Sequence, residues 1–235
     1  MQSDNRYTQM QKAFYNANAP KMAETDHKEH DSNPHYWDIL LGDLDDDWYE
    51  NDKSIKALDI GCGTGRNVRN LVKNWIWNSV HGIDISENNI KEAYNKLGEL
   101  VSPDFDKCKL YVNNGIDLKP LEDNTYDFVM STIVLQHICV YDIRFSLLSE
   151  AYRVMKEGGL FSFQMGYGNS PGTVGYYENH YDANSTNSDC DVRVDDPTQI
   201  LNDLIKIGFK NITYEIQPSW SNQVHNQWIY VKAYK

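Results

Sequence analysis

The residues best suited to bind a ligand are Gly61, Gly63 and Gly65, which stand at alternate positions directly after the largely apolar segment 57–60. Glycine has no Cβ, so the backbone at such a turn can approach a bound molecule closely. When the turn leads from a strand into a helix, the free N–H groups at the helix start favour a polar or anionic ligand. This stretch therefore predicts a nucleotide-like ligand, although the glycines alone do not identify it.

A second candidate ligand-binding residue, a carboxylate, follows this turn in the sequence. Asp84 lies nineteen residues after Gly65, at the end of a second apolar segment. A carboxylate there can accept hydrogen bonds from both hydroxyls of a ribose, which NAD and adenosyl ligands share. Dinucleotide-binding turns read GxGxxG, whereas Arg66 occupies the place of their third glycine here. The glycine spacing helps to distinguish a dinucleotide from an adenosyl ligand, but the presence of Asp84 is compatible with both.

The elements that position these residues alternate between strands and helices. Such βαβ units favour a parallel sheet that is covered on both faces. Ser86 is a suitable N-cap for the second helix, and Gly158-Gly159 marks the end of the third. The apolar periodicity predicts strands over residues 55–60, 79–85, 109–113, 126–131 and 160–165, and helices over residues 65–75, from Ser86 onwards, and over residues 142–157.

The chain continues with one more helix and a pair of strands. Asp196-Pro197 starts a helix that ends at Gly208. Strands over residues 212–217 and 227–234 follow, and the short loop between them predicts an antiparallel hairpin.

Two segments flank this regular pattern. Residues 166–195 are rich in Gly, Tyr, Asn, Ser and Asp and too long for an ordinary connection, which predicts an inserted, lid-like loop. Residues 1–54 predict an N-terminal helical arm, with one helix starting at Pro34, packed on a core domain formed by residues 55–235.

The composition indicates one globular, soluble chain. Of its 235 residues 40% are hydrophobic and 16 are tyrosines, which argues against disorder. The net charge of −12 repels polyanions, so we expect no nucleic-acid partner. Four cysteines without CxxC spacing and the lack of any apolar run near ~20 residues favour the cytoplasm and no membrane association. His27, His30 and His35 lack a metal-binding arrangement, so we expect no metal site.

The glycine turn and Asp84, combined with the stretch 113–131 and with Gly158-Gly159-Leu-Phe, resemble the class I S-adenosylmethionine-dependent methyltransferases of the small, UbiE-like kind. The resemblance covers residues 55–165 in detail. It implies an α/β fold with a Rossmann-like, seven-stranded sheet in the order 3-2-1-4-5-7-6 and one antiparallel strand, which agrees with the hairpin derived above. It also implies S-adenosyl-L-methionine as the cofactor.

The resemblance assigns cofactor-binding roles by position. Many relatives place an Asp after a Gly before the adenine site, whereas this chain has Asn114-Gly115 and delays the acid to Asp117. Which of Asn114, Ile116 and Asp117 meets the adenine amino group therefore stays open. The implied residues are Asp59, Gly61, Cys62, Gly63 and Arg66 around the methionine portion, Asp84 and Ile85 at the ribose and adenine, Asn114, Gly115, Ile116 and Asp117 along the adenine, and Ser131, Thr132 and Ile133 beside the sulfonium.

The implied reaction is an in-line displacement in which an acceptor lone pair attacks the methyl carbon. The protein mainly orients the reactants, excludes water and, where needed, removes a proton. His137 lies just beyond the fourth predicted strand and is the candidate catalytic base, because histidine titrates near neutral pH. The alternative role for His137 is to orient the loop or to touch the methionine end of the cofactor.

Aromatic residues could form a lid over an acceptor. The candidates come from the inserted segment and from the N-terminal arm, but tyrosines in a polar loop can equally be surface or oligomer contacts. The candidate substrate-binding residues are Trp37, Tyr167, Tyr176, Tyr177 and His180, with Tyr181 beside them.

The absence of two sequence motifs helps to predict the class of methyl acceptor. Amino-methyltransferases of DNA bases carry a [DNS]PP[YFW] tetrad where this chain has Ser131-Thr-Ile-Val134, and no Pro-Cys nucleophile of the cytosine-C5 enzymes is present. With the acidic charge, this favours a small-molecule or sugar acceptor, methylated on O, N or C. A protein acceptor, a non-catalytic S-adenosylmethionine-binding protein and, more remotely, an NAD-dependent oxidoreductase remain alternatives. The oligomeric state stays open.

Overall fold

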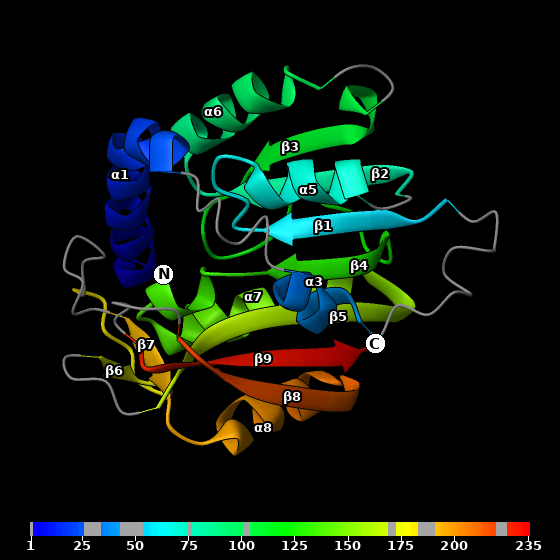
Figure 1. The fold of residues 1–235 in the computed structure, drawn as a ribbon. Helices are drawn as coiled ribbons and strands as arrows, with labels where there is room; N and C mark the ends of the chain where they lie inside the picture. Colours follow the sequence, from blue (N-terminus) through cyan, green and yellow to red (C-terminus); the bar gives the residue numbers. More distant parts are fainter. Residues whose placement is uncertain are drawn as a thin grey trace.

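The computed structural model describes residues 2–25, 34–42, 54–74, 77–100, 104–168, 173–182, 191–219 and 225–235, so His27 and His30 lie outside the described residues. Strands and helices alternate as the periodicity predicted (Figure 1). The helices are α1 (Gln2–Thr25), α3 (Pro34–Leu41), α5 (Arg66–Asn74), α6 (Glu87–Leu97), α7 (Tyr141–Val154) and α8 (Pro197–Ile207), with 3₁₀ helices η1 (Phe105–Lys107) and η2 (Leu135–His137). The strands are β1 (Lys56–Ile60), β2 (Ser79–Asp84), β3 (Cys108–Val112), β4 (Tyr126–Ser131), β5 (Met155–Tyr167), β6 (Val174–Gly175), β7 (Val192–Val194), β8 (Lys210–Pro218) and β9 (Gln227–Tyr234).

Most of the strands form a parallel sheet. Its central order is β3-β2-β1-β4-β5. β9 pairs antiparallel with β5 on one side and with β8 on the other. When β6 and β7 are left out of the count, β8 is the sixth strand and β9 is the seventh. The strand order is then the predicted 3-2-1-4-5-7-6, with β9 as the one antiparallel strand. The predicted fold class is therefore confirmed.

The segment 166–195 differs from the irregular lid-like loop that its composition predicted. β5 continues to Tyr167, beyond the end of β4, and so leaves an unpaired edge. β7 pairs with that edge at Gly166 and Tyr167, and β6 pairs with β7. The valines of these two short strands are buried, which a mobile surface loop would not require. The described part of the segment thus extends the sheet.

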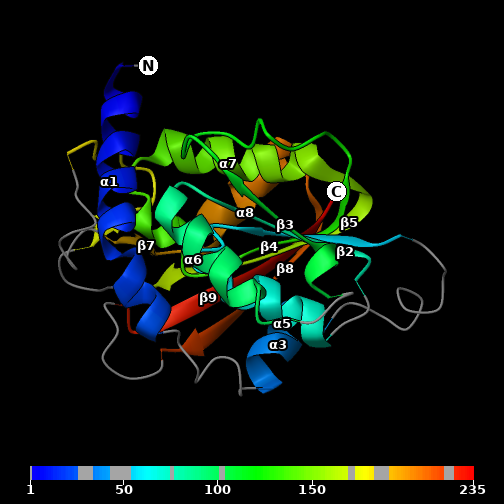
Figure 2. The ribbon, with the colours of Figure 1, turned by 90° about the horizontal axis from the view of Figure 1, so that it is seen from above.

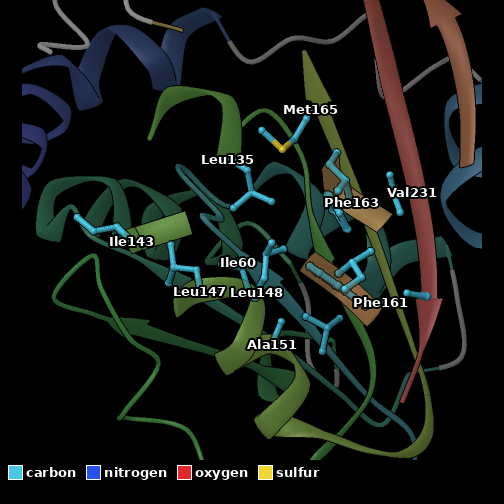
Figure 3. Close-up of a cluster of buried hydrophobic side chains, with 14 of the residues drawn as sticks. Ile60, Leu135, Ile143, Leu147, Leu148, Ala151, Phe161, Phe163, Met165 and Val231 are labelled. Atoms are coloured by element: carbon cyan, nitrogen blue, oxygen red, sulfur yellow. The ribbon is translucent and has the colours of Figure 1, made fainter. Parts of the chain in front are cut away.

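Helices cover both faces of the sheet (Figure 2). Successive side chains of a strand point to opposite faces, so β1 contributes to two separate clusters. Leu58 and Ile60 pack with Leu147 of α7, as the close-up of this cluster shows for Ile60 and Leu147 (Figure 3). Ala57 packs with Leu71 of α5 on the other face. This burial on both sides explains why the central strands read as nearly continuous apolar runs.

α7 ends earlier than predicted. The sequence predicted a helix to residue 157, but Met155 already pairs with Tyr126 of β4. Met155 is fully buried in the main core, which favours the strand conformation. Gly158 has a φ of 77°, and its N–H donates to the Lys235 carbonyl at 3.1 Å. The glycine pair therefore forms a turn inside an extended segment and does not terminate the helix.

α1 is a regular helix that crosses the carboxyl ends of the parallel strands (Figure 1). Lys12 forms an ion pair of 2.6 Å with Glu87 at the start of α6. The side-chain oxygen of Asn16 accepts hydrogen bonds from the Ser86 hydroxyl at 2.7 Å and from the Asn88 N–H at 3.2 Å. These contacts attach α1 to α6. Within the described residues, no helix combines the length and hydropathy that a bilayer span needs.

Candidate active site

β1 ends in a tight turn that leads directly into α5. Gly61, Gly63 and Gly65 have positive φ angles of 74°, 52° and 84°. The N–H groups of Gly61 and Cys62 donate to the Ile83 carbonyl of β2, at 2.8 and 3.1 Å, and fix the turn against the sheet. A Cβ at Gly63 would meet no protein atom within 4 Å. The space beside Gly63 is thus open to a ligand.

The carboxylate of Asp84 holds this turn from the neighbouring strand. Its Oδ2 accepts the N–H of Gly63 at 2.9 Å, and its Oδ1 accepts the N–H of Ser86 at 2.8 Å and the side-chain amide of Asn89 at 3.2 Å. Burial raises the pKa of Asp84, although these hydrogen bonds favour the ionised form. The end of β2 therefore presents a fixed, buried acceptor, which is what the hydroxyls of a ribose require.

A cavity of about 320 Å³ lies between this turn and α1. Its volume is within the range of small-molecule sites. Its lining includes residues that directly follow the carboxyl ends of β1, β2, β3 and β4, where open α/β sheets bind their ligands. α1 supplies one wall through residues that the sequence did not single out, namely Tyr7, Thr8, Gln11, Tyr15 and Met22.

The sequence of the segment that surrounds this cavity is similar to the sequences of known proteins. Residues 58–163 match the family model described as a methyltransferase domain. The demethylmenaquinone methyltransferase of Staphylococcus aureus (strain MRSA252) is 34% identical over 109 residues, which make up 46% of this chain and 42% of the relative. The chain thus spans about two fifths of the length of this curated relative.

Solved structures share the fold. A SAM-dependent methyltransferase from Archaeoglobus fulgidus superposes with a TM-score of 0.55 at 19% identity, over 84% of this chain and 94% of that one. Haemonchus contortus phosphoethanolamine N-methyltransferase 2, in complex with phosphomonomethylethanolamine and S-adenosylhomocysteine, has a TM-score of 0.60 at 20% identity, over 86% and 53%. Residues 58–163 match a methyltransferase domain, and the chain has the fold of S-adenosylmethionine-dependent methyltransferases.

The methyltransferase domain fits S-adenosylmethionine at several points. The open space at Gly63 can receive the chain of the ligand, and Asp84 can accept from the ribose hydroxyls. Arg66 places a guanidinium in the cavity wall, where it can meet a carboxylate. Asn89 also lines the cavity, and its buried Oδ1 has no hydrogen-bond partner in the described part of the chain. The donor and acceptor set therefore matches an adenosyl ligand with an amino-acid portion.

Most of the residues that the resemblance assigned to the methyltransferase site do line this cavity. They come from the glycine turn, the end of β2, and the loops after β3 and β4, so the topology brings together positions far apart in the sequence. These residues are Gly61, Cys62, Gly63, Arg66, Asp84, Ile85, Gly115, Thr132, Ile133 and His137.

Asp59 and Ser131 lie beneath the site and do not form its wall. The Ser131 hydroxyl donates to the Ile60 carbonyl at 3.0 Å and so ties β4 to β1. The Asp59 side chain is 1% exposed. Burial raises the pKa of Asp59 to about 7, although the positive charge of Arg66 opposes this rise. Asp59 is thus buried under the site and, within the described residues, is not part of the cavity lining.

Of the polar residues after β3, Asn113 lines the cavity, whereas Asn114 and Asp117 do not. The side-chain oxygen of Asn114 accepts the N–H groups of Ile116 and Asp117, at 2.8 and 2.9 Å. Asp117 also forms a 2.8 Å ion pair with Lys119, whose side chain is exposed. Gly115 lines the cavity beside Asn113, and a Cβ at Gly115 would lie 2.5 Å from the Ile85 side chain. Gly115 and Ile85 therefore form the apolar side expected for adenine.

The aromatic residues expected to cover an acceptor lie elsewhere. Trp37 of α3 is buried in the core, and the hydroxyl of buried Tyr176 donates to Asp203 at 3.0 Å, so both stabilise the core. Tyr177 is exposed and donates to the Gln199 carbonyl. The lining of the cavity, within the described residues, includes none of the predicted substrate residues Trp37, Tyr167, Tyr176, Tyr177 and His180. Trp37 and Tyr176 are thus part of the core, whereas Tyr177 and His180 are exposed outside the cavity.

His137, which lines the cavity at the end of η2, has a carboxylate partner. Its Nδ1 lies 2.7 Å from Oδ1 of Asp191, and Nε2 of His225 lies 3.4 Å from Oδ2 of the same carboxylate. Burial opposes ionisation of Asp191, but the two histidines outweigh it and hold the pKa of Asp191 well below its usual value. Sequence reasoning missed Asp191 and His225 because both stand at the edges of segments without periodicity.

Tyr15 of α1 faces the two carboxylates of the site. Burial, together with the charges of Asp84 and Asp191, raises the pKa of Tyr15 well above its ordinary value. Its hydroxyl therefore stays protonated at neutral pH. α1 was predicted as an arm on the core, but its largely polar sequence gave no sign that Tyr15 and Gln11 would form a wall of the cavity.

Proposed function

We propose that this protein transfers a methyl group from S-adenosylmethionine to a small organic acceptor, with His137 as the proton acceptor. One observation carries the proposal: His137, held by Asp191, lines the same cavity as the glycine turn and Asp84. The proposed cofactor-binding turn and the proposed base therefore line one cavity. The whole of the chain, with the arm 1–54 and the domain 55–235, would act as one unit because α1 closes this space.

Each group has a definite task in this proposal. When bound, S-adenosylmethionine supplies an electrophilic methyl carbon on a positively charged sulfur. Asp84 binds the ribose and Arg66 the amino-acid carboxylate, which fixes the position of the methyl carbon relative to His137. His137 accepts the proton that the acceptor loses. α1 keeps water from the cavity.

The acceptor class rests on three supports. The relatives named above act on demethylmenaquinone or bind phosphomonomethylethanolamine, both small molecules. The net charge of −12 disfavours a nucleic acid. The cavity volume suits a cofactor with a small partner. A small molecule or sugar in the cytoplasm is accordingly the proposed acceptor.

The test has two stages on the full chain. Calorimetry should detect binding of S-adenosylmethionine and S-adenosylhomocysteine but not of NAD, and Asp84→Ala should abolish it. Methyl-labelled S-adenosylmethionine is then offered with separate pools of naphthoquinols, phosphoethanolamine, sugars and proteins. Label in a small-molecule pool supports the proposal. Binding with no transfer to any pool would indicate a non-catalytic protein, and label only in the protein pool would identify a protein methyltransferase.

A further inference from the structure

Asp191 connects three segments that are distant in the sequence. It stands directly before β7, its Oδ1 meets His137 after β4, and its Oδ2 meets His225 before β9. His225 is 1% exposed, and its ring fills the space above Gly166 of β5, where a Cβ would lie 2.2 Å from the ring. The ring also packs against Trp228. Its position is therefore fixed by close packing.

The chemistry of the contact fixes the proton on His137. An ionised carboxylate only accepts hydrogen bonds, so the 2.7 Å contact requires a proton on Nδ1 of His137. The lone pair of the neutral ring is then on Nε2. In the described part of the chain Nε2 has no hydrogen-bond partner, and His137 lines the cavity. The ring thus has a free proton-accepting atom at the site.

The role of His225 follows from the burial of Asp191. A largely buried carboxylate with one partner would lose much of its hydration without replacement. The second imidazole lies 3.4 Å from the oxygen that His137 does not use, where a protonated ring can pair with the charge of the carboxylate. Other carboxylates of this region, such as Asp84, are already held by backbone N–H groups and do not compete for His137.

We propose that Asp191 and His225 are positioning residues that hold His137 as the Nδ1–H tautomer, with Nε2 toward the acceptor. This inference rests on the proposed function and narrows its substrate class to acceptors that must lose a proton, such as a hydroxyl, an ammonium or an activated C–H group. In the step, the lone pair of the acceptor atom forms the bond to the methyl carbon. The electron pair of the C–S bond stays on sulfur, and the proton of the acceptor passes to Nε2 of His137.

The first test does not need an acceptor. Long-range ¹H–¹⁵N NMR of the full chain labelled at histidine, with His137 assigned through His137→Gln, reports which ring nitrogen carries the proton. The wild type should show the Nδ1–H tautomer. Asp191→Asn should shift neutral His137 toward Nε2–H, because an amide can donate to Nδ1, whereas the matched variant Asp195→Asn should change nothing. An Nε2–H tautomer in the wild type, or an unchanged spectrum in Asp191→Asn, overturns the proposal.

The second test separates positioning from binding. With the acceptor found by the labelling experiment, Asp191→Asn should lower kcat at least about 100-fold, while the affinity for S-adenosylhomocysteine changes less than about threefold. His225→Gln keeps an N–H toward Asp191 and should retain most of the tautomer preference, which guards against a loss caused by misfolding. If S-adenosylmethionine does not bind at all, the proposed function is wrong. The NMR measurement still tests separately whether Asp191 sets the tautomer of His137. An equal fall in kcat and affinity in Asp191→Asn contradicts it.

Discussion

The side-chain oxygen of Asn16 in α1 accepts a hydrogen bond of 2.7 Å from the hydroxyl of Ser86, which itself caps α6 by accepting the Asn89 N–H. The N-terminal helix is thus attached to the residue that caps α6, two positions after Asp84, the proposed ribose-binding carboxylate. Loss of this hydrogen bond should therefore disturb the cavity in two ways, because α1 and the end of β2 both line it.

Asn16→Ala should therefore weaken cofactor binding. It removes the acceptor for Ser86 and Asn88, and a hydrogen bond contributes about 1 kcal/mol, so we expect the affinity for S-adenosylhomocysteine to fall about fivefold to twentyfold by calorimetry. Asn18→Ala is the matched control, because Asn18 bonds only within α1 in the contacts described, to the Phe14 carbonyl. Equal effects of the two changes would show that helix stability, and not the contact with α6, determines binding.

Gly63→Ala should block the cofactor without unfolding the protein. The new methyl group would enter the cavity, and the positive φ of 52° would add a backbone cost of about 1 kcal/mol. Gly158→Ala is a matched control, because Gly158 has a φ of 77° and equally open surroundings but does not line the cavity. Both variants should lose similar stability in urea, and only Gly63→Ala should lose S-adenosylmethionine affinity, by more than tenfold. A similar loss of affinity in Gly158→Ala would remove the steric explanation.

His137→Ala should reduce turnover by about 10² to 10⁴-fold and leave the affinity for S-adenosylhomocysteine nearly unchanged. The reason is that the proposed function assigns His137 to the acceptor and Gly63 and Asp84 to the cofactor, and all three line the cavity. Steady-state kinetics and calorimetry on the same preparation measure the two effects. A parallel fall in both would instead assign His137 to the methionine end of the cofactor.

Asp59 should make the stability of the protein depend on pH. Its pKa of about 7 in the folded protein exceeds the ordinary value of about 3.9. Between these values the unfolded chain has released the proton that the folded chain still binds, so stability falls as the pH rises from about 4 to about 7, by up to about 4 kcal/mol. The difference in unfolding free energy between the wild type and Asp59→Asn should follow this slope and level off above pH 7. The same difference for Asp195→Asn should stay flat; a flat difference for Asp59→Asn would mean that the carboxyl is ionised throughout.

Tyr176→Phe distinguishes a core role from a substrate role. The change leaves the buried Oδ2 of Asp203 without its donor, so we expect a loss of about 1 to 3 kcal/mol in unfolding free energy. Tyr177→Phe, at an exposed ring, should cost little. Methyl transfer per folded molecule should be the same in both variants. A loss of transfer with unchanged stability in Tyr176→Phe would restore the acceptor role expected from the sequence.

The sequence predicted the architecture well because its signals are local. The β4 and β9 bounds agree with those expected from the alternating pattern, and Ser86 and Asp196 cap α6 and α8 as their residue types predicted. The glycine turn and Asp84 could be placed together because both follow strands of one parallel sheet, whose carboxyl ends meet at a single edge.

The rest depended on contacts that no local pattern encodes. Asp191 meets His137 across 54 residues, and its position depends on how far β5 extends beyond β4. Tyr176 was read as a lid residue because its neighbours are polar, yet Asp203 and the underlying core bury it. Met155 continues the helical pattern of α7 but is drawn into β5 by pairing with Tyr126. In each case tertiary contact overrides a local preference.

α1 supplies a wall of the cavity through a single helix, and the ion pair between Lys12 and Glu87 that helps to attach it is largely exposed. Exposed pairs of this kind add little stability and weaken with salt. Release of the spent nucleoside would then follow the rate at which α1 detaches, so turnover would rise with ionic strength where release limits the cycle. The same salt that loosens the helix would shorten the lifetime of the bound donor.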